Sequence, residues 1–168
     1  HLTMTLEADD AFIFADDVGA VEQESPTPQA VSPKFKPALL TPAMIFYRWA
    51  EIEPMLADVG MKDHTPSSLF KVLVDPNVRV YLVAIIRGEE IRALIGLELI
   101  ETPLGDRWLN ITFVTGQHVK RWINEVEPAV LHWARGYGCT RAVGLFRKAF
   151  KKFLPHWKYT HDYLELEL

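Results

Sequence analysis

Metal-binding and nucleophilic side chains are the first places to look for chemistry, and their spacing here predicts neither kind of site. The chain has six histidines and one cysteine. No His-x-x-x-His or Glu-x-x-His pair occurs, so the sequence predicts no metal site. Cys139 follows Gly138 at a predicted helix-to-strand turn, and no neighbouring histidine completes a nucleophile pair. We therefore expect this cysteine to be a small buried apolar residue.

A basic and aromatic run near the C-terminal end could bind an anion. It combines phenylalanines with four cations, which are Arg147, Lys148, Lys151 and Lys152. Such a run attracts phosphate or nucleic acid by its charge, and it could equally bind an acidic segment of this chain or of a neighbour. A solvated helix face is the simpler interpretation, and the sequence leaves these alternatives open.

An acidic and aromatic segment near the N-terminal end is complementary to that run. Phe12, Ile13 and Phe14 lie between two pairs of aspartates. Short segments of this kind often dock on a protein surface, and the alternative is a linker with a few incidental apolar residues. We expect a protein partner, or a second copy of the chain in a homo-oligomer, to be bound through this segment and the basic run.

The composition indicates one globular domain preceded by an arm. The chain has 168 residues, of which 49% are hydrophobic and 24% are charged, as is typical of a domain with its own core. Residues 1–42 hold seven acids, two bases and five of the eleven prolines. We expect an extended arm there and a folded domain over residues 43–168. The net charge of −4 argues against a dedicated nucleic-acid binder, which would normally be basic.

No segment of the sequence resembles a membrane span or a secretory signal. Its apolar runs fall short of the roughly 18 residues that a membrane-spanning helix requires. The N-terminal residues lack a cationic start and a small-residue cleavage site. We expect a cytoplasmic protein that binds no membrane.

The periodicity of the apolar residues predicts the elements that position these side chains. The predicted helices cover 42–56, 66–73, 119–137 and 148–154, the first two with Thr41 and Thr65 as N-caps. The predicted strands cover 78–86, 91–100, 107–115, 141–146 and 157–168. Five residues on one face of the third helix should be buried, namely Ile123, Val126, Val130, Ala134 and Tyr137. This order predicts an α+β or α/β domain with a mixed sheet.

The segment from Glu127 to Leu145 carries a resemblance to a known family. Its helix, Gly-Cys turn and strand resemble the central helix and fifth strand of the GNAT superfamily of acetyl-CoA-dependent N-acyltransferases. The basic run and the predicted strand after it resemble the last helix and closing strands of that family. The resemblance covers residues 43–168 and implies a GNAT-like mixed central sheet flanked by helices. The sequence is most similar in character to divergent GNAT-like proteins encoded by tailed bacteriophages.

The resemblance implies a cofactor site at the start of the central helix. GNAT enzymes bind the pyrophosphate of acetyl-CoA there through the pattern Gln/Arg-x-x-Gly-x-Gly/Ala. The matching residues are Gly116, Gln117, His118, Val119, Lys120 and Arg121, followed by Trp122. Gln117 fits, whereas Lys120 and Trp122 stand where small residues are expected, and the tryptophan should crowd an incoming phosphate. The two cations could still form a differently built anion site with Gly116.

The catalytic groups that the resemblance implies are only partly present. Many GNAT enzymes use a tyrosine of the last helix as the general acid, and the corresponding helix here offers Phe150 and Phe153 instead. Glu98 or Glu101 could act as the general base, assisted by Asn110 or Thr112. The alternative is that both carboxylates are merely solvated.

Three functions remain open from the sequence. The departures from the family pattern favour a non-catalytic GNAT-fold phage protein that serves binding or virion assembly through its arm and needs no cofactor. The alternative is an active N-acetyltransferase that uses acetyl-CoA to modify a host protein or a small amine. A third hypothesis is an inhibitor whose acidic arm mimics nucleic acid. The first hypothesis places the protein in the cytoplasm of a host cell and in the virion.

Overall fold

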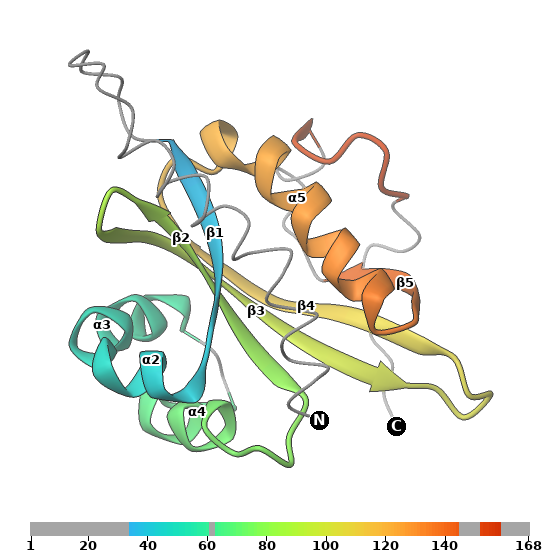
Figure 1. Ribbon diagram of the computed structural model, residues 1–168, viewed down its shortest axis with the longest axis horizontal. Helices are drawn as coiled ribbons and strands as arrows, with labels where there is room; N and C mark the ends of the chain where they lie inside the picture. Colours follow the sequence, from blue (N-terminus) through green and yellow to red (C-terminus); the bar gives the residue numbers. More distant parts are fainter. Residues whose placement is uncertain (1–33, 61–62, 145–151, 159–168) are drawn as a thin grey trace, which may run out of the picture.

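The computed structural model describes residues 34–60, 63–144 and 152–158, which form a mixed sheet with helices on both faces (Figure 1). The strands lie in sequence order in the sheet and are β1 (Phe35–Leu40), β2 (Val80–Arg87), β3 (Glu90–Glu101), β4 (Arg107–Gly116) and β5 (Cys139–Gly144). The helices are α2 (Pro42–Tyr47), α3 (Trp49–Val59), α4 (Pro66–Leu73) and α5 (Val119–Gly136). The predicted α+β fold with a mixed sheet is confirmed.

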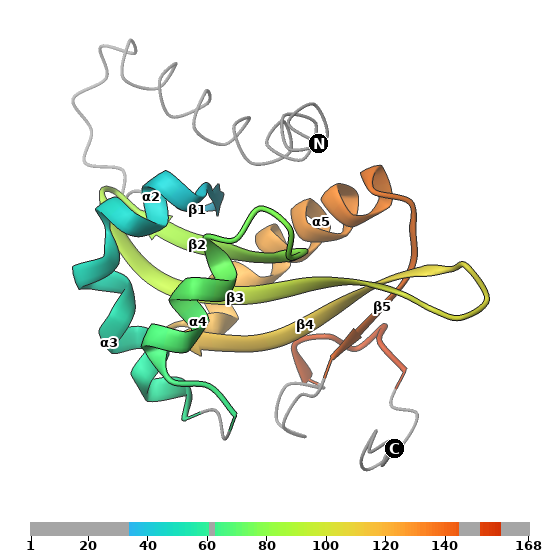
Figure 2. The same cartoon turned by 90° about the horizontal axis from the view of Figure 1, so that it is seen from below.

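The strand directions follow from the lengths of the connections. Neighbouring strands from β1 to β4 are antiparallel, and β5 is parallel to β4. Short turns join β2 to β3 and β3 to β4, whereas α5 carries the chain back between the parallel pair, as a parallel connection requires. Figure 2 shows the long β3–β4 ribbon extending past α3 and α4.

Two apolar cores lie on opposite faces of the sheet. On one face α5 packs against β2, β3 and β4, with Trp122, Val126 and Trp133 among its buried side chains. On the other face α2, α3 and α4 pack through Ile45, Ile52 and other aliphatic residues. The alternation of side chains along each strand supplies both cores, since both faces are covered. All five residues that the periodicity predicted to be buried are buried, four of them in α5 and the fifth, Tyr137, at its C-cap.

The helix predicted over 42–56 is two helices in the structure. Thr41 caps α2 by accepting a hydrogen bond from the backbone N–H of Met44 at 3.2 Å. Arg48 then leaves the helical conformation, with φ −104° and ψ 19°. Its guanidinium donates to Glu51 at 2.7 Å and to the carbonyl oxygen of Glu89 at 2.6 Å. These contacts fix a corner between α2 and α3, and Pro54 lies inside α3, which continues to Val59.

The sequence analysis placed no strand before residue 43, and the structure has one. β1 pairs along its whole length with β2, from Phe35 opposite Arg87 to Leu40 opposite Leu82. Ala38, Leu39 and Leu40 are buried. Residues 35–40 are therefore part of the folded sheet, although the segment in which they lie, residues 1–42, is rich in proline and acidic residues. The rest of the predicted arm, residues 1–33, lies outside the described residues.

The other predicted elements have mixed outcomes. The strands predicted over 78–86, 91–100 and 107–115 are confirmed within two residues as β2, β3 and β4. β5 begins at Cys139, two residues earlier than predicted. Most of the predicted strand over 157–168 and most of the predicted helix over 148–154 lie outside the described residues, and the two described residues of that strand, Trp157 and Lys158, are not in a strand. Within the described part of the chain, no helix is long and apolar enough to cross a lipid bilayer.

Candidate functional site

The turn between β4 and α5 has a backbone that depends on one glycine. Gly116 adopts φ +119°, and a Cβ atom there would lie 2.5 Å from both the Cα of Ala93 and the carbonyl oxygen of Arg92. The backbone N–H of Gln117 donates to that same oxygen at 3.4 Å. His118 then adopts φ +61°, the single positive φ among non-glycine residues of the described chain. The turn is thus held close to β3 before the helix begins.

The first turn of α5 is suited to an anion. Helix N-termini expose backbone N–H groups that have no partner within the helix, and no side chain caps α5. The first turn holds no acidic residue, while Lys120 and Arg121 are both exposed there. Cations at this end oppose the helix dipole, so they weaken the isolated helix while they strengthen the attraction for a negatively charged group.

Trp122 does not crowd this turn, contrary to the sequence-based expectation. Its side chain is 0% exposed and belongs to the core between α5 and the sheet. Its indole N–H donates to the carbonyl oxygen of Gln117 at 3.0 Å. Trp122, Val126 and Val130 follow one another at intervals of four residues, which places them on one helical face. The indole therefore anchors the turn from the inside and leaves its outer side open.

Part of the outer edge of β4 is free of any described strand. β5 pairs with β4 from Arg107 opposite Cys139 to Ile111 opposite Gly144. From Thr112 to Gly116 no strand in the described residues pairs with this edge. The edge groups of a strand are ready to bond an extended chain, and this stretch leads directly into the first turn of α5. We call Thr112–Gly116 the open edge.

A β-bulge at Thr112 changes which side chains of β4 face each helix layer. Gly96 of β3 lies opposite Phe113, and the next residue of β3, Leu97, lies opposite Ile111. Thr112 is therefore the extra residue on β4. Because of the bulge, both Ile111 and Val114 face the α5 core, while Phe113 packs in the core of α3 and α4.

Glu98 lies near the end of the pairing between β4 and β5 that the described residues show. On β3 it is directly opposite Asn110 of β4, and it is half-buried. Its neighbours Leu97 and Leu99 both belong to the α5 core, so Glu98 faces the opposite side of the sheet, the side of α3 and α4. Asn110 is half-buried beside it. The structure thus brings Glu98 together with Asn110, whereas Thr112, the other residue predicted to assist, is the exposed extra residue of the bulge.

Glu101 is held in a different role. Its carboxylate bonds the guanidinium of Arg107 at 2.7 Å and that of Arg79 at 3.4 Å. The hydrogen bond from Arg107 lowers the pKa of Glu101 below its ordinary value, which makes it a weaker proton acceptor. It also lies at the hairpin end of β3, whereas Gly116 is at the other end of β4. The prediction that Glu101 serves as the general base receives no support from this arrangement.

The remaining residues that the sequence analysis singled out are Cys139 and those predicted to bind a partner. Cys139 is half-buried, and burial raises the pKa of its thiol, so the thiolate that a nucleophile needs is disfavoured. Lys152 is exposed, with its Nζ 5.0 Å from the ring centre of Phe153. The other residues predicted to bind a partner lie outside the described residues, namely Phe12, Ile13, Phe14, Arg147, Lys148 and Lys151. Phe150 also lies outside them.

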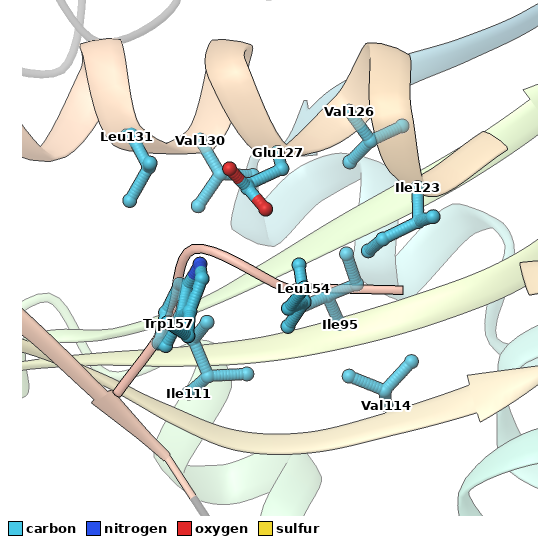
Figure 3. Close-up of a pocket in the computed structure, with 10 residues that line it drawn as sticks. All are labelled: Ile95, Ile111, Val114, Ile123, Val126, Glu127, Val130, Leu131, Leu154 and Trp157. Atoms are coloured by element: carbon cyan, nitrogen blue, oxygen red, sulfur yellow. The ribbon is translucent and has the colours of Figure 1, made fainter. Parts of the chain in front are cut away.

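An apolar pocket that the sequence analysis did not predict lies between α5 and the sheet (Figure 3). Leu154 and Trp157 form one wall, and Ile111 and Val114 of β4 form the floor. The side wall comes from α5 and includes Glu127, whose carboxylate is 2.5 Å from Nε2 of His156. In the described residues no cluster of three or more histidine, cysteine or acidic side chains could hold a metal ion.

Comparison with solved structures places this arrangement in a known fold. A GNAT family acetyltransferase from Staphylococcus aureus aligns with a TM-score of 0.60 and 10% identity over 80% of this chain and 99% of the other. Glucosamine-6-phosphate N-acetyltransferase from Arabidopsis thaliana aligns with a TM-score of 0.58 and 12% identity over 80% of this chain and 97% of the other. The chain has the GNAT fold.

A solved structure that is not described as an acetyltransferase also aligns with the chain. A transcriptional regulator from Bacillus halodurans aligns with a TM-score of 0.57 and 18% identity over 80% of this chain and 99% of the other. No protein-family model and no curated protein sequence matches the chain. The likeness to acetyltransferases is therefore one of fold, and the chemistry has to be argued from the residues of this chain.

Proposed function

We propose that this chain is an acyl-CoA-dependent N-acetyltransferase that binds acetyl-CoA along the open edge of β4 and at the first turn of α5. The observation that carries the proposal is the continuity of these two features. The pantetheine part of coenzyme A is an extended chain with two amide groups, which can bond a free strand edge as another strand would. Its pyrophosphate is an anion, which the uncapped helix start favours.

The residues present fit such a ligand in three respects. The turn after β4 needs β4 and β3 to lie close together at Gly116, and glycine allows this because any side chain there would collide with Ala93. The Trp122 indole is turned into the core, which removes the main steric objection raised by the sequence. Lys120 and Arg121 take the place of the family's small residues, and their charge supports the same anion.

Glu98 is the general base in this proposal. The amine nitrogen forms a bond to the acyl carbon, the bond from that carbon to sulfur breaks, and the electron pair stays on sulfur. The nitrogen loses one proton to Glu98 or to a water that Glu98 holds, and the thiolate gains a proton from solvent or from an acid outside the described residues. Asn110, directly opposite on β4, is placed to orient the amine.

Calorimetric titration of acetyl-CoA into the full chain tests the proposal. The double variant Lys120→Glu/Arg121→Glu should lower the affinity at least tenfold, since two cations near the phosphates become anions. It should not unfold the protein, because acidic residues stabilise a helix N-terminus by about 0.3 to 1 kcal/mol each. The matched control is Lys71→Glu/Arg135→Glu, which changes the net charge equally in the last turns of α4 and α5 and should keep the affinity.

Catalysis is tested separately, by following the release of free thiol from acetyl-CoA in the presence of primary amines. A panel drawn from a peptide N-terminus, an aminosugar and a polyamine covers chemically different acceptors. Glu98→Gln should lower turnover by roughly 10²-fold or more and keep the affinity for acetyl-CoA. Glu101→Gln should change neither. An unmodified chain that binds no acetyl-CoA would refute the proposed function.

The second candidate is the non-catalytic binding protein, and one observation favours it. Phe153 packs against the α5 core where a GNAT enzyme would carry its proton donor, and no tyrosine of the described residues lies at the open edge. Docking of the N-terminal arm, a role in virion assembly and a phage origin stay predictions of this second candidate. Sedimentation of the full chain beside a Phe12→Ala/Phe14→Ala variant would test the arm, since loss of self-association in the variant is expected if the arm joins subunits.

A further inference from the structure

The pocket between α5 and the sheet lies at the end of the open edge. Ile111, which forms part of its floor, is the last residue of β4 that pairs with β5 within the described part of the chain. Val114, also in the floor, belongs to the open edge itself. Gly116, at the start of the α5 turn, is about 17 Å from Ile111 along an extended strand. A ligand anchored by its phosphates at α5 and extended along the edge therefore ends beside this pocket.

The walls of the pocket are apolar. Figure 3 shows the side chains of α5 pointing towards Leu154 and Trp157, with Ile95, Ile111 and Val114 beneath them. All but one of the residues that line it are aliphatic or aromatic. The exception is Glu127, and its carboxylate is already bonded by His156 at 2.5 Å. Glu127 is thus the one ionisable side chain in a lining that is otherwise aliphatic or aromatic, and an apolar cavity stays dry.

The cavity has a volume of about 30 Å³, which is room for about two or three groups of the size of water or a methylene. Trp157 is half-buried and Leu154 is buried, so the segment that closes the pocket is itself fixed by apolar contacts. The space is therefore large enough for a few carbon atoms beyond an acetyl group and too small for a long acyl tail.

We propose that this pocket binds the acyl chain of the donor and that the preferred donor carries a short aliphatic acyl group longer than acetyl, such as propionyl or butyryl. The inference rests on the proposed function, because the thioester reaches the pocket only if coenzyme A lies along the open edge. The acyl tail then points to the α5 side of the sheet. Glu98 lies on the other side, so the tail does not obstruct the approach of the amine.

The test compares the affinities of the full chain for coenzyme A and for its acetyl, propionyl, butyryl and octanoyl thioesters by calorimetry. Burial of each methylene in an apolar site strengthens binding by about fourfold. We expect the affinity to rise about fourfold from acetyl to propionyl and again to butyryl, and to fall for octanoyl. A flat series, or one that is tightest for acetyl, would overturn the inference and leave the proposed function standing. Failure of every thioester and of coenzyme A to bind would refute the proposed function itself.

Variants of one wall residue provide a second test, because the order of affinities across the thioesters is compared within each variant. Leu131 is half-buried on α5 and lines the pocket away from β4. Leu131→Phe should fill the cavity and abolish the gain in affinity from acetyl to butyryl. Leu131→Ala should enlarge the cavity and move the optimum to a longer chain. Met55→Ala, at a half-buried position beside the other core, is the control and should leave the order of affinities unchanged. An unchanged order in both Leu131 variants would place the acyl chain elsewhere.

Discussion

Replacement of Trp122 by phenylalanine tests whether the indole anchors the turn or blocks it. The substitution removes the hydrogen bond from the indole N–H to the carbonyl oxygen of Gln117, which is 3.0 Å long and is worth about 1 kcal/mol. It also removes part of a side chain that is 0% exposed, and the cavity left behind should cost about 1 to 2 kcal/mol. We therefore expect a loss of about 2 to 3 kcal/mol in the free energy of unfolding.

Urea denaturation followed by far-UV circular dichroism measures this loss without relying on tryptophan fluorescence. Trp49→Phe is the control, since Trp49 is half-buried and stacks edge-on against Phe70 at 4.7 Å; its cost should stay below about 1 kcal/mol. Calorimetry should find no gain in acetyl-CoA affinity for Trp122→Phe. A variant that keeps its stability within about 0.5 kcal/mol and binds acetyl-CoA more tightly would refute the anchoring role. That result is expected of a side chain that blocks the site, because its removal would open the site.

Three further substitutions probe the frame of the site. Gly96→Ala should destabilise the protein by about 1 to 3 kcal/mol in urea denaturation, because its Cβ would lie 2.3 Å from the ring of Phe113. Thr65→Ala should cost about 1 kcal/mol in the same assay through loss of the capping box of α4. Arg107 lowers the pKa of Glu101 below its ordinary value of 4.5. The Arg107–Glu101 ion pair therefore stabilises the folded state above that pH, and this contribution is lost as the pH falls through the folded-state pKa of Glu101. The difference in stability between the unmodified chain and Glu101→Gln should therefore shrink when denaturation is repeated at progressively lower pH.

Each of these substitutions has a matched control. Gly88→Ala has no atom within 4 Å of the new Cβ and only the strain of a positive φ, so it should cost less than Gly96→Ala; the reverse order would contradict the close approach at the bulge. Ser67→Ala, exposed in the same helix turn as the cap, should change stability by less than 0.5 kcal/mol. Glu53→Gln, at an exposed glutamate of α3, should give a difference that does not shrink with falling pH as the one for Glu101 does.

The sequence predicts local elements well because their signals are periodic. The buried face of α5 follows from apolar residues three and four positions apart, and the structure confirms it. The same periodicity places Trp122 on the face of Val126 and Val130, so the inward direction of the indole could have been predicted from spacing alone. Comparison with the family's glycine pattern gave the opposite expectation, since alignment to a motif fixes a position and says nothing about where a side chain points.

The arrangement at the open edge could not be predicted in the same way. It depends on where β5 stops pairing with β4, and the two strands are joined only through α5. The bulge at Thr112, which sets the facing of Ile111 and Val114, has no periodic signal of its own. The difference between Glu98 and Glu101 likewise depends on the register of the β3–β4 hairpin, which brings Arg107 to Glu101 and Asn110 to Glu98.

The mixture of antiparallel and parallel strand pairs in the sheet has a consequence for the order of folding. β2, β3 and β4 form an antiparallel meander joined by short turns, so their contacts are local and cost little loop entropy. β5 pairs with Arg107–Ile111 only after the whole of α5 has crossed between the strands, and non-local pairings of this kind form slowly. We expect the meander to nucleate folding and β5 to dock late. The pairing of β4 with β5 then marks a boundary between a part of the sheet that forms early and a part that forms last, and local unfolding of the native protein should begin on the β5 side of that boundary.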